Sequence, residues 1–290
     1  MAILAIAAAA SLFTAAAACV GPHEDCRSSK CCSTPGMACY QKNDHWASCR
    51  QSCTPGVDPY DHPDHRTPWS CDLLEEFAGG APIAPVTLPV EAPRGSPVAK
   101  HGQLRVKGNQ VVDKSGNPVR LRGMSFFWSQ WMGHYWNEDV VEWLRSDWKV
   151  SLVRAAMGVE MGGHLENPEA ETKKLQAVVH AAIKVGIYVI IDWHDHHAEQ
   201  HKIQAKLFFD AMARAYGKYP NVLFETFNEP EHQSWWHVIK PYHQEVVGVI
   251  RKHSDNLVIC GTPRWSQDVD VASTDPVPGK NIAYTIHFYA

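Results

Sequence analysis

The chain has 290 residues, of which 45% are hydrophobic, enough to build a sizeable folded core and too many for a disordered protein. Its 27 basic and 31 acidic residues give a net charge of -4 at pH 7, and no long run of like charge occurs. This balance argues against a nucleic-acid partner, whose phosphates require a basic surface.

The first 18 residues have the pattern of a secretory leader. They are apolar apart from Ser11 and Thr14, and they end in four alanines, the small residues that a signal peptidase accepts. We therefore predict a signal peptide at residues 1–18 and a secreted, extracellular protein with no membrane contact after leader removal. Because no Lys or Arg precedes the apolar run, an uncleaved anchor or a lipid attached at Cys19 is the alternative.

Residues 19–78 form a cysteine-rich segment. Eight of the nine cysteines lie between Cys19 and Cys71, an even number in a segment too small to build its own core. We predict four disulfides, without choosing among the roughly 105 possible pairings. Zinc is the competing explanation, but two Cys-x-x-Cys pairs are missing.

Aromatic residues stand among these cysteines, at Tyr40, Trp46 and Trp69. Indole faces stack on the apolar faces of sugar rings, so we hypothesise that the module binds carbohydrate. The alternative is a disulfide-bonded module whose aromatic side chains pack internally.

Residues 79–100 contain recurrent prolines, which predict an extended linker. These prolines are Pro82, Pro85, Pro89, Pro93 and Pro97.

From residue 101 to residue 290 the chain alternates between strand and helix patterns. A hairpin is predicted around Gly108 and Asn109, and six apolar runs with the length of buried strands follow. Alternation of this kind is typical of a parallel sheet. The predicted strands are 119–124, 150–155, 187–192, 222–227, 257–260 and 282–287, and the predicted helices are 138–147, 168–185, 200–216 and 235–253.

The alternation alone fits either an open doubly wound sheet or a closed barrel. No Gly-x-Gly-x-x-Gly motif follows the first strand, and polar groups accumulate after every strand rather than at one crevice. We therefore favour an α/β fold of the (β/α)8 TIM barrel type, preceded by the small disulfide-rich module.

The residues at the predicted strand ends are suited to cleaving an acetal. Asn228 and Glu229 come where an apolar run ends and Pro230 prevents its continuation. A carboxyl held at the mouth of a barrel can protonate a leaving oxygen and then activate water. Arg154 and His194, at the ends of two preceding strands, can orient carboxylates and hold them in place.

Six motifs carry a resemblance to a known family. They are residues 120–125 (RLRGMS), 153–157 (VRAAM), 190–194 (IIDWH), 227–230 (FNEP), 265–269 (WSQDV) and 287–290 (HFYA). Together they resemble the cellulase-like members of glycoside hydrolase family 5 from about residue 104 onward. That resemblance implies retaining endo-hydrolysis of β-1,4-glucan, so the expected partner is a β-glucan polysaccharide. We further expect no cofactor, no metal ligands and a monomer.

The resemblance also implies roles for individual residues. Glu229 falls on the position of the general acid/base, and the other predicted catalytic residues are Asn228, Arg154, His194, His287 and Tyr289. Gln130, Trp131 and Trp265 fall where the family contacts glucosyl units. The residues after Ser125 depart from the family, since many relatives have a His-Gly pair there.

The sequence ends before the strand-seven glutamate that serves the family as nucleophile. We therefore expect about six strands and a barrel incomplete in this sequence, with the nucleophile beyond residue 290. Glu225 has the strand parity of Glu229 and is expected to be a buried structural group four residues deeper. Glu160 and Asp195 lie nearer the mouth, but nothing in the sequence places either opposite Glu229.

Two other functions compete with this one. A non-catalytic protein could hold glucan on Trp131 and Trp265 without cleaving it. A barrel metallohydrolase is suggested by the histidine spacing around His194 and His201, although metal barrels of the amidohydrolase type keep such a pair on the first strand. Cys260, the last residue of the predicted strand 257–260, has no neighbouring cysteine in the sequence and is expected to be a buried thiol.

Overall fold

The computed structural model describes residues 19–34, 37–50, 53–74, 88–89 and 91–288. Outside these residues lie the predicted leader, Tyr289, and residues 79–87 and 90 of the predicted linker. The chain divides into two compact units, Met1–Ala78 and Gly79–Ala290, which are described separately. No helix in the described part of the chain combines the length and the hydropathy needed to cross a membrane.

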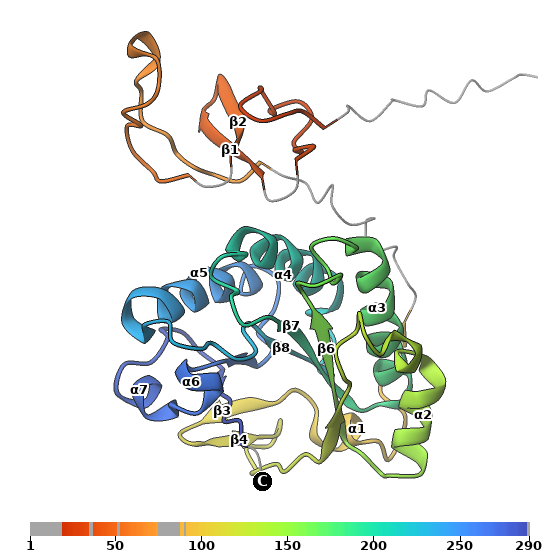
Figure 1. The fold of residues 1–290 in the computed structure, drawn as a ribbon. Coiled ribbons are helices and arrows are strands. Elements are labelled where there is room, and N and C mark those ends of the chain that lie inside the picture. Colours follow the sequence, from red (N-terminus) through yellow and green to blue (C-terminus); the bar gives the residue numbers. More distant parts are fainter. Residues whose placement is uncertain (1–18, 35–36, 51–52, 75–87, 90, 289–290) are drawn as a thin grey trace, which may run out of the picture. The chain divides into compact units, whose positions relative to one another are not determined.

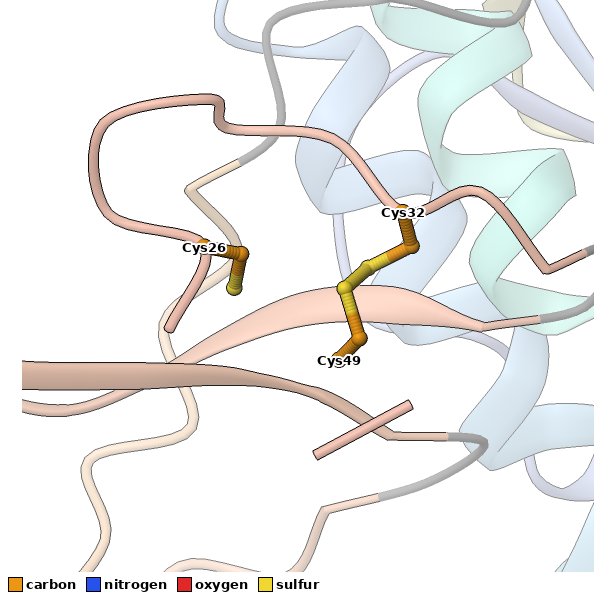
Figure 2. A group of neighbouring side chains, drawn as sticks. All are labelled: Cys26, Cys32 and Cys49. Atoms are coloured by element: carbon orange, nitrogen blue, oxygen red, sulfur yellow. A yellow bond between two sulfur atoms is a disulfide. The ribbon is translucent and has the colours of Figure 1, made fainter. Parts of the chain in front are cut away.

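The N-terminal unit is built on a two-stranded antiparallel sheet, β1 (Ala38–Asn43) and β2 (Trp46–Arg50), followed by the short 3-10 helix η1 (Pro63–His65). Its eight cysteines form the four predicted disulfides, which join Cys19 to Cys31, Cys26 to Cys39, Cys32 to Cys49 and Cys53 to Cys71. Figure 2 shows three of these cysteines close together, in a group that could suggest a metal site. All three are in disulfides, so the zinc alternative is wrong.

The C-terminal unit contains a six-stranded parallel sheet whose spatial order follows the chain order. Parallel neighbours in sequential order are the arrangement of a barrel wall, whereas a doubly wound sheet reverses its order at a switch point. This confirms the predicted barrel class. The strands are β5 (Gly123–Ser125), β6 (Leu152–Gly158), β7 (Tyr188–His194), β8 (Val222–Glu225), β9 (Val258–Cys260) and β10 (Ile282–Tyr284).

Helices cover the outer face of this sheet. Figure 1 shows α2 to α5 following one another around strands β6, β7 and β8. Asn137 caps α2 by accepting a hydrogen bond from Val140 N, and Gly186 ends α3 in the left-handed conformation that glycine adopts without strain. The main helices are α2 (Glu138–Ser146), α3 (Pro168–Val185), α4 (Lys202–Tyr216) and α5 (Lys240–Ile250), with η2 (Gly133–Tyr135), α6 (Pro263–Ser266) and α7 (Val269–Thr274) in the connections.

Alternate residues of the strands pack in two separate apolar clusters. Val189, Ile191 and Trp193 of β7 face the helices, in the large cluster that also contains the core of α3 and α4. Tyr188 and Ile190 face the opposite side, where they pack with Leu223 of β8. The second cluster is closed from below by α1 (Pro97–His101) and by the hairpin of β3 (Arg105–Lys107) and β4 (Gln110–Val112).

The same alternation places polar residues above the inner cluster. Asp192 and Glu225 follow Ile190 and Leu223 at intervals of two residues and pair with each other in the parallel register. Arg154 occupies the matching face of β6, two residues after Leu152. The barrel interior is therefore apolar at its base and charged toward the carboxyl ends of the strands.

Three features differ from the sequence prediction. The predicted helix at 235–253 is divided into the π-helical turn η3 (Trp235–Ile239) and α5, because Pro241 lacks the N–H that a regular helix requires. The helices α6 and α7 were not anticipated. The end of the predicted linker forms α1, which Ser96 caps and whose Val98 is buried.

Candidate active site

Glu229 lies in the loop that follows β8, four residues beyond the end of the strand. Only 8% of the residue is exposed. His287, which follows β10, forms a hydrogen bond of 2.7 Å between its Nδ1 and Glu229 Oε1. His196 holds the same residue from the β7 side, with its Nδ1 3.1 Å from the Glu229 carbonyl oxygen. The carboxyl is thus positioned from the ends of three strands.

Arg154 is the centre of a charged cluster beneath this loop. Its Nε and Nη2 donate to the two oxygens of Glu225 over 2.7 and 3.0 Å, a fork that fixes both groups. Its Nη2 also lies 2.8 Å from Asp192 Oδ2. Burial works against the guanidinium charge, but Asp192 and Glu225 more than offset it and raise the pKa of Arg154. The arginine is therefore a permanent cation here.

Asn228 is connected to the same cluster. Its Oδ1 accepts a hydrogen bond of 2.8 Å from Arg154 Nη2, which fixes the orientation of the amide. Its carbonyl oxygen accepts a hydrogen bond from Ser266 Oγ in α6. Because Arg154 occupies the oxygen side, the amide nitrogen is the group that Asn228 can offer to a sugar hydroxyl.

His194 ends β7 with its ring next to Asp192. Its Nδ1 donates to Asp192 Oδ2 over 2.6 Å. Burial, with the positive charge of Arg154, lowers the pKa of His194 to about 3, so the ring is neutral and its orientation is set by the carboxylate. Trp128 packs edge-on against the ring, with centroids 4.4 Å apart.

Two carboxyl groups share the Arg154 cation. Burial raises the pKa of Asp192 to about 7, and it also raises the pKa of Glu225, in both cases against the lowering effect of Arg154. Their protonation is coupled, because one guanidinium cannot fully compensate two buried charges. Glu225 is a buried, hydrogen-bonded group, as its strand parity predicts.

Exposed aromatic side chains lie in the loops after the strands. Trp131 is 50% exposed and Trp265 is 37% exposed. Trp128 stacks on Trp131 with centroids 4.8 Å apart. Trp265 has a left-handed backbone with φ of 56°, as do both of its neighbours, and its N–H donates to the Pro230 carbonyl. Such strained backbone in a bulky residue is uncommon and often marks a functional position.

Gln130 differs from Trp131 in its surroundings. Its Nε2 donates to the Glu160 carbonyl over 3.1 Å, and its amide packs so closely on Gly158 that a Cβ there would lie 1.9 Å from the Gln130 oxygen. This side chain therefore connects the loop after β5 to the end of β6 through a hydrogen bond and a close packing contact.

The structure joins five of the predicted site residues into two connected groups. Arg154 bonds Asn228 directly and His194 through Asp192, while Glu229 bonds His287. Sequence reasoning missed the part played by Asp192, although its spacing of two residues from His194 already indicates the same face of the strand. Ser266 gave no sequence signal, because its contact depends on the fold of α6.

The four histidines at and after the end of β7 form two separate groups. His194 and His196 face the cluster around Glu229, whereas His197 and His201 face Glu160 and Asp195. His201 Nδ1 lies 2.8 Å from Asp195 Oδ2, and His197 Nδ1 lies 3.6 Å from Glu160 Oε2. Asp195 and Glu160 are thus engaged with histidines rather than set opposite Glu229.

Comparison with known proteins identifies the family. The model of the family "Cellulase (glycosyl hydrolase family 5)" matches residues 112–290. The chain is 49% identical to Endoglucanase Z of Dickeya dadantii over 193 residues, which cover 64% of this chain and 45% of the relative. It is 43% identical over 210 residues to Endoglucanase N of Pectobacterium atrosepticum, covering 71% and 47% of the two chains.

Solved structures give the same result. The catalytic domain of the Thermobifida fusca endoglucanase superposes with a TM-score of 0.65 at 36% identity, and the match covers 68% of each chain. A Cytophaga hutchinsonii structure gives a TM-score of 0.66 at 52% identity, covering 67% of this chain and 64% of the other. This chain spans about half the length of the curated relatives it matches. It belongs to the cellulase family, glycoside hydrolase family 5.

Proposed function

We propose that the protein hydrolyses β-1,4-glucan chains internally, with retention of configuration, and that Glu229 is the general acid/base. The observation that carries the proposal is the placement of Glu229: a carboxyl only 8% exposed, held by His287 at the mouth of the barrel, directly after Asn228. The relatives named as endoglucanases support the substrate class, and the T. fusca enzyme has been solved in complex with cellotetraose.

In this proposal Glu229 protonates the glycosidic oxygen as the bond breaks and later removes a proton from the attacking water. Asn228 offers its amide nitrogen to a hydroxyl of the sugar at the cleavage point. Neutral His194 and cationic Arg154 keep the floor of the site ordered by holding Asp192 and Glu225. Trp131 and Trp265 supply apolar surfaces for glucosyl rings on either side.

Retention also requires a second carboxylate about 5 Å from the first. Glu225 and Asp192 are engaged with Arg154, and Glu160 and Asp195 with histidines. We therefore assign the nucleophile to the family's strand-seven glutamate, which falls after residue 290 in this numbering. The intact mass of the protein isolated from its source tests this assignment, because a nucleophile after residue 290 requires a longer chain.

The acid/base role is tested with the full-length protein and its Glu229→Gln variant. On cello-oligosaccharides we expect kcat/KM to fall by about 10³-fold or more, because the amide cannot donate the required proton. On an aryl β-cellobioside with a good leaving group, which needs no proton, bond cleavage should be largely retained. Glu169→Gln, in the exposed first turn of α3, is the matched control and should retain full activity. Equal losses on both substrates would contradict the assignment.

The same assay separates the competing functions. Binding of cello-oligosaccharides without release of reducing ends would favour a non-catalytic glucan-binding protein. Activity that a chelator abolishes and zinc restores would favour a metallohydrolase.

For the cysteine-rich module we propose binding of a single glucan chain. A cavity of about 610 Å³ lies among β2, η1 and the loop before η1, and its lining includes Trp46, which is 40% exposed. Trp69 in the same lining is only 3% exposed and bonds Asp61, so it forms the floor rather than a platform. A concave site with one exposed indole suits one chain or chain end better than a flat crystalline surface.

Trp46→Ala in a Glu229→Gln background tests this role by titration with soluble cello-oligosaccharides. We expect the loss of one binding event, while Tyr60→Ala, which changes an exposed residue outside the cavity, should leave it unchanged. Binding that is identical in both variants would assign all saccharide contact to the catalytic unit.

We further propose that the protein is secreted and acts as a monomer. The four disulfides favour an oxidising compartment. N-terminal sequencing of the protein from the culture medium should begin at Cys19, and its mass in solution should equal that of one chain.

A further inference from the structure

We propose that Glu160, Asp195 and His197 form a binding site for a divalent transition-metal ion, with Zn²⁺ as the best fit, which braces the loops after β6 and β7. The proposal departs from the expectation of no metal ligands drawn from the sequence. It is independent of the catalytic proposal, since the ion is given no part in the reaction.

The backbone brings these residues together. Gly158 and His194, the last residues of β6 and β7, are register partners in adjacent parallel strands. Glu160 lies two residues past the first of these ends, and Asp195 and His197 lie one and three residues past the second. Loops that leave neighbouring strand ends in this way converge at the same edge of the barrel.

The three potential ligand atoms are already close to a binding geometry. One oxygen of Glu160, one oxygen of Asp195 and one ring nitrogen of His197 all lie within 4.8 Å of one another. His197 Nδ1 and Glu160 Oε2 are 3.6 Å apart. Atoms bound at about 2.0 to 2.1 Å to one tetrahedral ion lie roughly 3.3 Å apart, so only small side-chain movements are needed.

The charge of the group calls for a cation. The Asp195 side chain is fully buried, and Glu160 lies beside it. Throughout residues 91–288, every ion pair of Glu160, Asp195 and Glu231 is with a histidine, and none is with Lys or Arg. Buried carboxylates require compensation. A divalent ion bound between Glu160 and Asp195 would compensate both carboxylates at once.

Both carboxylate oxygens of Asp195 have hydrogen-bond partners that fix the side chain, as is common for carboxylates that bind metals. Its Oδ2 bonds His201 Nδ1 over 2.8 Å, and its Oδ1 accepts the His197 N–H over 2.8 Å. Each oxygen retains a further lone pair for an ion. Outer partners of this kind orient ligating carboxylates in metal sites. Glu160 and His197, with side chains 37% and 39% exposed, leave the position open to ions from solvent.

The donor set selects the class of metal. One imidazole nitrogen with carboxylate oxygens suits Zn²⁺ and related ions, while Ca²⁺ and Mg²⁺ prefer shells made only of oxygen. A bound ion would join the loops that follow β6 and β7. It would also reach the loop after β8, where Glu229 N lies 3.5 Å from the Asp195 carbonyl oxygen.

The test is calorimetric titration of the full-length protein, first treated with a chelator and dialysed, with ZnCl₂ in a buffer that does not bind metals. We expect one saturable site, and affinity at least about tenfold weaker in both His197→Gln and Glu160→Gln. His62→Gln, which changes an exposed histidine of the N-terminal unit, is the control and should bind as the parent does.

Two further measurements complete the test. Zinc at about 100 times its Kd should raise the melting temperature of the parent by a few degrees and that of His197→Gln by less. Absence of saturable binding up to millimolar zinc, or unchanged affinity in both site variants, would overturn the proposal. A larger stabilisation by Ca²⁺ than by Zn²⁺ would overturn the choice of metal.

Discussion

His287 Nδ1 lies 2.7 Å from Glu229 Oε1, and this hydrogen bond joins the segment after β10 to the loop after β8. The two residues are 58 positions apart in the sequence. The orientation of the proposed acid/base is therefore set by a strand end two places away in the sheet order.

Replacing His287 with Ala should lower kcat on cello-oligosaccharides by about 10- to 100-fold, because the Glu229 carboxyl loses a hydrogen bond that positions it for proton transfer. KM should change little, since His287 orients Glu229 rather than the substrate. Steady-state kinetics of the full-length protein measure both constants. His253→Ala, which removes a histidine bonded to Asp210 in α4, should leave kcat unchanged; a similar loss there would point to general destabilisation.

Arg154→Met should destabilise the barrel unit by about 3 to 5 kcal/mol, because it leaves Asp192 and Glu225 buried without their cation. Urea unfolding followed by tryptophan fluorescence measures the change. Arg214→Met removes an exposed ion pair within α4 and should cost less than about 1 kcal/mol. Equal midpoints for the two variants would show that the Arg154 cluster contributes no more than a surface pair.

His164 should make the folded state less stable in acid. It is 6% exposed, packs edge-on against Trp193 and Phe208, and burial lowers its pKa to about 4 from an ordinary value of 6.5. Between these values the unfolded chain binds a proton that the folded chain excludes. Stability is therefore fully present above pH 6.5 and falls as the pH drops toward 4, by about 3 kcal/mol for this group.

Replacing His164 with Phe should remove this contribution. We expect the free energy of unfolding to vary less between pH 6.5 and pH 4 in the variant than in the parent, as measured by urea titrations across that range. His232→Phe, at an exposed position, should reproduce the parent profile. A parent-like slope in His164→Phe would mean that other groups cause the acid sensitivity.

Trp131→Ala should weaken glucan binding. Half of this side chain is exposed, and loss of its stacking surface should raise KM for cello-oligosaccharides by up to about tenfold, equivalent to about 1.4 kcal/mol. Trp148→Ala, at 55% exposure, is the matched control and should not change KM. The melting temperature of each variant shows whether either effect comes from unfolding.

Much of the fold was predictable because its signals are local. The predicted helix at 168–185 coincides with α3, since Pro168 favours the first turn and Gly186 ends the last one. The strands were found in order, although β5 and β10 are shorter than their apolar runs. A strand extends only as far as its backbone forms hydrogen bonds with a neighbouring strand. The sequence does not show where that pairing ends.

The sequence suggests candidate site residues, but it does not reveal the contacts that join them. Strand parity places Asp192 and Glu225 inside the barrel, yet their shared arginine depends on the register among β6, β7 and β8. The turn of Gln130 toward the end of β6 depends on the absence of a side chain at Gly158. Contacts of this kind form between segments that are far apart in the sequence. The periodicity of hydrophobic residues therefore does not predict them.

All four disulfides lie within residues 19–71, and the remaining cysteine, Cys260, is buried, with its pKa raised by burial to about 12. A reductant therefore acts on the two units unequally. It breaks the disulfides of the N-terminal unit, whereas the described residues 91–288 contain no disulfide and their single cysteine is buried. We therefore expect a reductant to destabilise the cysteine-rich module while leaving residues 91–288 covalently unchanged.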